Sequence, residues 1–116
     1  MGRLTTHVLD TASGTPAQAM KLSLFALENG QRKLLKETAT NSDGRCDAPL
    51  LEAGNFKVGQ YEIVFDVGPY FSKLGELPSP NFLNDVPIRF AIADASAHYH
   101  VPLLVSPWAY STYRGS

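Results

Sequence analysis

The sequence has 116 residues, 44% hydrophobic and 18% charged, which is typical of one soluble globular domain (residues 1–116) with a single core. Its formal net charge of −1 argues against broad electrostatic attraction to nucleic acid or to an anionic membrane. Because the only cysteine, Cys46, cannot form an internal disulfide, and no apolar run resembles a membrane span or a signal-peptide core, we expect a cytoplasmic protein.

The first predicted element is a strand over residues 4–9, a segment rich in β-branched side chains. Side chains alternate between the two faces of a strand, so His7 lies on the face opposite Val8, with Thr5 and Leu9 beside it. Turn-forming residues then end this strand.

A β-hairpin is predicted next. The alternating pattern of residues 21–27 leads to Asn29 and Gly30, a pair that favours a two-residue type I′ turn. The partner strand, residues 32–40, is half polar, which indicates a position near the edge of a sheet or a strand with one face in water.

A second turn at residues 41–44 is followed by Arg45, Cys46 and Asp47, and we expect a long irregular loop from there to Gly59. Residues 60–66 have the clearest strand pattern in the chain. Its inward-facing side chains are those of Tyr61, Ile63 and Phe65.

The one helix candidate is the segment 68–75. Pro69 lies near its first position and Gly75 just past its end, the usual asymmetry of helix termini. A helix of about two turns is too short to persist without packing against the rest of the domain. A proline-containing loop then leads to a strand over residues 86–92, and Pro87 lies either at the start of that strand or in an edge strand.

The last nineteen residues predict a second hairpin, in which two strand-like runs meet at a Ser-Pro turn signal. In the first run, Tyr99 and Val101 begin an apolar face, whereas His98 and His100 lie on the opposite face. The second run ends in Tyr-Arg-Gly-Ser, and we expect this end of the chain to be used rather than disordered.

About seven to eight short strands and one short helix predict an all-β fold, a sandwich of two sheets. No internal repeat or low-complexity segment interrupts it.

Two histidines are the first candidates for a functional site. A single His on a strand is more often structural, but His7 and His100 both lie on the non-core face of their strands. A face that mixes imidazole with Thr, Pro and Leu is typical of a cavity wall or a subunit interface. The arginines are less specific, because Arg45 follows a turn, where a charge is usually solvated, and Arg114 would ordinarily pair with the carboxylate of Ser116.

Neither a metal site nor a cysteine nucleophile is indicated. His98 and His100 share a face, but no Cys, Asp or Glu accompanies them, and a zinc site needs three or four ligands. Cys46 has no identifiable base partner. We expect no metal and no cofactor.

Several separated segments resemble the transthyretin-related 5-hydroxyisourate hydrolases. Residues 4–17 are similar to the family's first motif, residues 43–45 (Asp-Gly-Arg) to its second, residues 98–104 to its third, and the final Tyr-Arg-Gly-Ser to its terminal motif. Cys46 and the loop of residues 78–81 follow none of these motifs.

This resemblance implies a transthyretin-like sandwich with one short helix after the fifth strand. It also implies a homotetramer, a dimer of dimers with a channel between the dimers, in which the final hairpin supplies contacts.

The resemblance further implies an enzyme of urate (purine) degradation that needs no cofactor. Such an enzyme opens the six-membered ring of 5-hydroxyisourate with water and forms 2-oxo-4-hydroxy-4-carboxy-5-ureidoimidazoline. The implied catalytic residues are His7, Arg45, His100 and Ser116. The implied substrate-binding residues are His7, Arg45, Tyr113 and Arg114.

The implied residue types suit hydrolysis of a ring amide. Imidazole, with a reference pKa of about 6.5, can deprotonate water near neutral pH, so His7 or His100 is the general base and the other orients the water or protonates the leaving nitrogen. Arg45 would stabilise the developing oxyanion. Tyr113 and Ser116 would hold the planar substrate.

Two alternatives have no enzymatic activity. The same fold in vertebrate transthyretin carries thyroid hormone, so a small-molecule carrier is the main alternative. A sandwich that serves purely as an interaction module is the second, because fold alone does not determine function. Neither alternative requires His7, Arg45 and His100 together.

Overall fold

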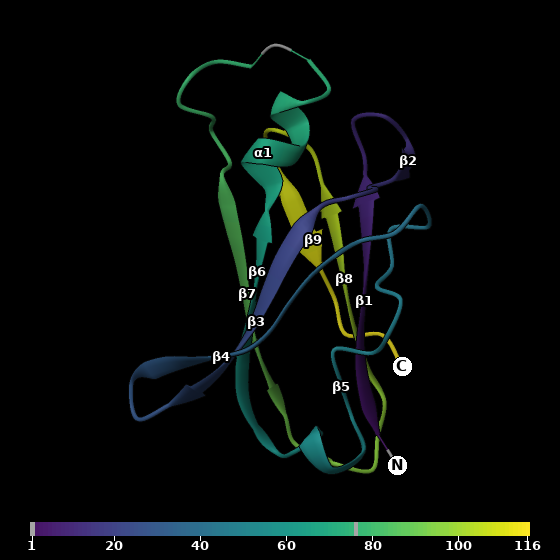
Figure 1. Cartoon of the computed structure of the whole chain (residues 1–116), viewed down its shortest axis with the longest axis vertical. Coiled ribbons are helices and arrows are strands. Elements are labelled where there is room, and N and C mark those ends of the chain that lie inside the picture. The colour runs from purple at the N-terminus through teal and green to yellow at the C-terminus, as the bar shows by residue number, and fades with distance from the viewer. Residues whose placement is uncertain (1, 76) are drawn as a thin grey trace.

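Two β-sheets pack face to face, with one short α-helix at one end of the molecule (Figure 1). The structure is a computed structural model and describes residues 2–75 and 77–116. The first sheet has the strand order β2-β1-β8-β9, with β5 also paired to β1, and the second has the order β4-β3-β6-β7. The strands of the first sheet are β1 (Arg3–Asp10), β2 (Thr15–Pro16), β5 (Leu51–Glu52), β8 (Tyr99–Val105) and β9 (Tyr110–Thr112). Those of the second are β3 (Lys21–Glu28), β4 (Gln31–Ala39), β6 (Gly59–Asp66) and β7 (Asp85–Ile92), and the helical segments are the 3-10 turn η1 (Ala53–Asn55) and α1 (Val67–Ser72).

The predicted fold class, a two-sheet sandwich with one short α-helix, is confirmed. Within the part of the chain that the structure describes, the sheets contain five and four strands, slightly more than expected because they include the two-residue strands β2 and β5. Such short pairings leave no alternating pattern that a sequence could reveal.

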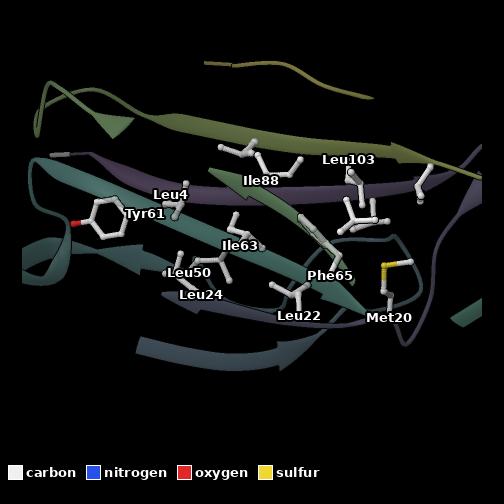
Figure 2. Close-up of a cluster of buried hydrophobic side chains, with 14 of the residues drawn as sticks. Leu4, Met20, Leu22, Leu24, Leu50, Tyr61, Ile63, Phe65, Ile88 and Leu103 are labelled. Carbon is white, nitrogen blue, oxygen red and sulfur yellow. The ribbon is translucent and has the colours of Figure 1, made fainter. Parts of the chain in front are cut away.

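The core lies between the sheets and is built from alternate residues of the strands. Figure 2 shows Leu4, Ile63, Phe65 and Leu103 reaching into this layer from β1, β6 and β8. Fully burying one such side chain contributes about 1.5–3 kcal/mol. Since a slip of one residue would turn every side chain to the other face, this burial fixes the register of each strand.

The predicted β-hairpin is confirmed. Glu28 pairs with Gln31, and Asn29 and Gly30 have φ values of 50° and 75°, which are the left-handed values that a type I′ turn requires. β4 and β7 lie at the two edges of their sheet, which is one of the two positions expected from the polar pattern of β4 and from Pro87 of β7.

Two sequence-based expectations were wrong in detail. The helix spans Val67–Ser72 rather than residues 68–75. It begins one residue earlier because the amides of Val67 and Gly68 both donate to the Asn84 carbonyl. It ends earlier because the chain tightens into a turn, in which the Leu74 amide donates to the Phe71 carbonyl. The loop predicted between Asp47 and Gly59 is interrupted by β5 and η1.

That loop is ordered by its apolar residues. Leu50 and Leu51 are buried, and the Leu50 amide donates to the Leu4 carbonyl at 2.8 Å, so this stretch extends the first sheet beside β1. Adjacent leucines were the only signal of this contact in the sequence.

A buried carboxylate ties the helix to the end of β1. Asp10 is 1% exposed and accepts a hydrogen bond from the Tyr70 hydroxyl at 2.9 Å. Burial, together with this bond and the charge of Asp10, raises the pKa of Tyr70 to about 12, so the hydroxyl stays a donor.

No helix in residues 2–75 and 77–116 is long and apolar enough to cross a membrane.

Candidate active site

The two histidines lie on neighbouring strands at the centre of the first sheet. β1 and β8 run parallel, with Thr5 opposite His100 and His7 opposite Pro102. Both histidines are half-buried, and the centres of their rings are 6.5 Å apart. They lie on the outer face of the sheet, because Val8 and the other residues of opposite parity fill the core.

The turn of residues 41–44 brings Arg45 beside His7. Gly44 accepts a hydrogen bond from the Val8 amide at 2.8 Å, and Arg45 forms an isolated antiparallel bridge with His7. The side-chain oxygen of Asn41 accepts from the Arg45 amide at 3.2 Å and so holds the turn together. Gly44 has a φ of 75°, a conformation that favours glycine.

The last residues return to His100. The Gly115 amide donates to the His100 carbonyl at 2.7 Å, and the His100 amide donates to the Gly115 carbonyl at 3.2 Å. Ser116 therefore follows directly on the residue paired with His100, and Figure 1 shows the C-terminus returning beside the first sheet. The structure thus brings together three of the predicted catalytic residues, His7, Arg45 and His100, while Ser116 follows the residue that pairs with His100.

Hydrogen bonds hold both imidazole rings. Nε2 of His7 lies 2.9 Å from the carbonyl oxygen of Asp43, which can only accept, so this nitrogen carries the proton. Nδ1 of His100 lies 2.9 Å from Oγ1 of Thr5. Partners of this kind fix the orientation of each ring and select its tautomer.

The electrostatics of the site favour a neutral His100. Burial lowers its pKa below the usual value, and electrostatic interactions with Arg45 and His7 lower this pKa further. An imidazole that remains neutral near pH 7 can accept a proton from water.

Tyr113 and Arg114 lie away from the histidine pair within one chain. Both line a cavity of about 270 Å³ at the open edge of the sandwich, next to Tyr99 and Phe90. The Arg114 guanidinium stacks 4.2 Å from the centre of the Tyr99 ring and donates to the His98 carbonyl at 3.1 Å. The expected pairing of Arg114 with the carboxylate of Ser116 is therefore replaced by these two contacts.

His98 and Cys46, the other residues considered from the sequence, are not part of the histidine pair. His98 precedes β8 and is exposed, and the described residues contain no group of three or more His, Cys, Asp or Glu arranged to hold a metal ion. Cys46 is half-buried, and burial raises the pKa of its thiol, as does Asp47, against the opposing effect of Lys36. The protonated thiol is a poor nucleophile.

A larger cavity, of about 680 Å³, lies between β4 and the segment around β5. Lys33, Lys36 and Tyr61 are among its lining residues, and none of the predicted site residues is. It is separate from the histidine pair. Two further groups contact the histidines, the Thr5 hydroxyl and the Asp43 carbonyl. The sequence pattern does not reveal these contacts, because they depend on which segments lie side by side.

Comparison with known proteins identifies a family that the chain resembles over nearly its whole length. Residues 4–115 match the model of the HIUase/Transthyretin family. The chain is 59% identical to a 5-hydroxyisourate hydrolase of Ralstonia nicotianae, over 100% of both chains. Among solved structures, it is similar to the 5-hydroxyisourate hydrolase of Klebsiella pneumoniae, with a TM-score of 0.82, 34% identity and 100% of both chains covered.

It is also similar to sea bream transthyretin in complex with thyroxine, with a TM-score of 0.88 and 26% identity, over 97% of this chain and 94% of that one. The match to the family model covers nearly all of the chain, and relatives more than half identical span its full length. The chain belongs to the HIUase/transthyretin family.

Proposed function

We propose that the chain hydrolyses 5-hydroxyisourate on the outer face of its first sheet, at His7, Arg45, His100 and Ser116. The hydrolase activity itself is supported by full-length relatives of that name with 59% and 60% identity. The observation that carries the location is the convergence of the two imidazoles, whose ring centres are 6.5 Å apart beside Arg45.

In this proposal His100 is the general base. Its lowered pKa keeps the ring neutral, so it can take a proton from the attacking water. The hydroxide adds to the ring carbonyl carbon, the carbon–nitrogen bond breaks, and the proton ends on the leaving nitrogen. His7, whose Nε2 proton is already donated to Asp43, presents Nδ1 to orient the water or the substrate.

Arg45 supplies the positive charge. A guanidinium can donate two parallel hydrogen bonds to carbonyl oxygens, and it stabilises the negative charge that develops on the substrate oxygen. Ser116, next to the residue that pairs with His100, would contact the substrate. Substrate binding by Tyr113 and Arg114 stays a prediction, since within one chain both line the separate cavity at the sheet edge.

We further propose a homotetramer, a dimer of dimers, in the cytoplasm. The support is a group of exposed aromatic side chains at the C-terminal hairpin: Trp108 is 57% exposed, Tyr110 44% and Tyr113 60%. Clustered exposed aromatic residues are typical of interaction surfaces.

The test uses substrate made in place. Urate oxidase generates 5-hydroxyisourate, and its absorbance and the circular dichroism of the product are followed with and without this protein. We expect faster decay and an optically active product. Decay at the spontaneous rate would contradict the proposal.

A small-molecule carrier is the second candidate, favoured by the similarity to transthyretin in complex with thyroxine. Titration calorimetry with thyroxine distinguishes the two. Tight binding without hydrolysis would favour the carrier, and weak binding with hydrolysis the enzyme.

A further inference from the structure

The side chain of Thr5 forms a hydrogen bond with the imidazole ring of His100. The two residues are directly opposite each other on parallel β1 and β8, and both side chains lie on the outer face. Oγ1 of Thr5 and Nδ1 of His100 are 2.9 Å apart, in a half-buried position. Contact with water is therefore reduced around this hydrogen bond, which strengthens it.

The rest of His100 leaves its ring little freedom. Its backbone amide and carbonyl are both bonded to Gly115, at 3.2 Å and 2.7 Å. A Cβ at position 115 would lie 3.1 Å from Cδ2 of His100, so the chain end is also packed against one edge of the ring. Among the described residues, no hydrogen-bond partner is found for Nε2 of His100, which is the nitrogen left for water or substrate.

We infer that Thr5 is a positioning residue for the proposed hydrolysis: its hydroxyl oxygen accepts the proton of His100 Nδ1 and so leaves the lone pair of Nε2 directed at the reacting water. This inference rests on the proposed function of His100 as the base. It goes further by assigning a tautomer and the group that selects it.

The chemistry requires an acceptor at this place. A neutral imidazole has one N–H, and a base at Nε2 needs that proton on Nδ1. When Nε2 takes the proton of water, Nδ1 keeps its own, so the same bond to Thr5 is present before and after the transfer. Without the hydroxyl, the neutral ring has no reason to keep its proton on Nδ1, and the unreactive tautomer becomes populated.

The test is Thr5→Val, with Thr5→Ser as the matched control. Valine keeps the branched shape that suits a strand and removes only the hydroxyl, whereas serine keeps the hydroxyl. We expect Thr5→Val to lower kcat about 3- to 10-fold, the effect of losing one ordinary hydrogen bond, with KM nearly unchanged. Thr5→Ser should retain most of the activity. Thr5→Ala serves in place of Thr5→Val if the valine variant does not fold.

A readout independent of activity accompanies the kinetics. The ¹⁵N chemical shifts of the His100 ring distinguish a protonated Nδ1 from a protonated Nε2. We expect the Nδ1–H tautomer in the wild type and in Thr5→Ser, and a mixture in Thr5→Val.

The outcomes separate this inference from the proposed function. An active wild type with an unchanged Thr5→Val variant and an unchanged tautomer would overturn the inference alone. Equal losses in the valine and serine variants would also overturn it, because they would indicate a merely structural role. An inactive wild type would overturn the proposed function, while the ring shifts would still decide whether Thr5 selects the tautomer.

Discussion

The two histidines of the site have different hydrogen-bond partners, and this difference divides their chemical roles. His7 donates from Nε2 to a backbone carbonyl, which cannot exchange roles with it. His100 contacts a hydroxyl, which can donate or accept, and has the lowered pKa. This difference supports the proposed roles, in which His100 accepts the proton of water and His7 orients the water or the substrate.

Replacement of either histidine should abolish most of the activity. Because a positioned general acid or base contributes about 10²- to 10⁴-fold, we expect His7→Ala and His100→Ala to lower kcat/KM by at least 100-fold. His98→Ala is the matched control, since His98 is exposed and precedes β8. Rates are measured by the decay of 5-hydroxyisourate absorbance. A His98 variant as inactive as the other two would contradict this assignment.

The pH dependence should report His100. Burial, with Arg45 and His7, lowers its pKa, so the base form persists below pH 6.5 and the acidic limb of kcat/KM should lie below that value. Arg45→Gln removes a neighbouring positive charge and should move this limb to higher pH. Lys33→Gln, on exposed β4, is the control that should leave it in place. An NMR titration of the His100 ring checks the assignment. An acidic limb of kcat/KM that stays at the same pH in Arg45→Gln would refute it.

At the scale of elements, the turn before Arg45 connects the second sheet to the site. It follows β4 and is bonded to β1 through Gly44 and Val8. The position of Arg45 therefore depends on a backbone contact as well as on its own side chain.

Gly44→Ala should displace this turn. Gly44 has a positive φ, and a Cβ there would collide with the Val8 carbonyl oxygen. We expect a loss of more than about 1 kcal/mol in the free energy of unfolding, together with reduced activity as Arg45 moves. Gly54→Ala is the control, because a Cβ at Gly54 meets nothing within 4 Å. Urea unfolding and the hydrolysis assay measure the two effects, and a fully stable, fully active Gly44→Ala would contradict this account.

The second sheet carries a buried carboxylate, that of Glu62. Glu62 lies between the inward-facing Tyr61 and Ile63, so the alternation of the strand places it on the outer face. Glu62 on β6 is 3% exposed and accepts from Arg32 at 3.1 Å and from Arg89 at 2.8 Å. Burial raises its pKa, but the hydrogen bonds and charges of Arg89 and Arg32 outweigh this and lower the pKa below its ordinary value.

Glu62→Gln should therefore destabilise the sheet at neutral pH. Hydrogen bonds to a charged group contribute about 1.5–3 kcal/mol, and the exposure of both arginines places the loss near the low end. Because the folded pKa is lowered, the stabilisation is present above pH 4.5 and is lost as the pH falls through the folded pKa. Urea midpoints at pH 7 and pH 3, with the exposed Glu37→Gln as control, test this. Equal differences at both pH values would contradict it.

For the whole molecule, the proposed tetramer predicts a mass four times that of the 12.6-kDa chain. The exposed aromatic residues of the C-terminal hairpin should be covered in it. Light scattering coupled to size exclusion measures this mass, and activity measured across a dilution series shows whether assembly is required. A fully active monomer would rule out an essential contribution from a second subunit.

Much of the fold could be predicted because strands have a period of two. Local alternation was enough to place His7 and His100 on the non-core faces, and Asn29 with Gly30 was enough to define a hairpin. The two-residue strands and the end of the helix were not predictable, since single contacts such as Leu50 with Leu4 determine them.

The sequence by itself determined which residues face the core and which chemically suited side chains remain outside it. Only the tertiary structure decided which of those side chains meet. Thr5 and His100 are 95 positions apart and share a hydrogen bond because β1 and β8 are parallel neighbours. Arg114, adjacent in sequence to the residue paired with His100, lies instead on Tyr99. The physical reason is that the face of a side chain follows from local backbone geometry, whereas the partner of a strand is selected by packing of the whole core.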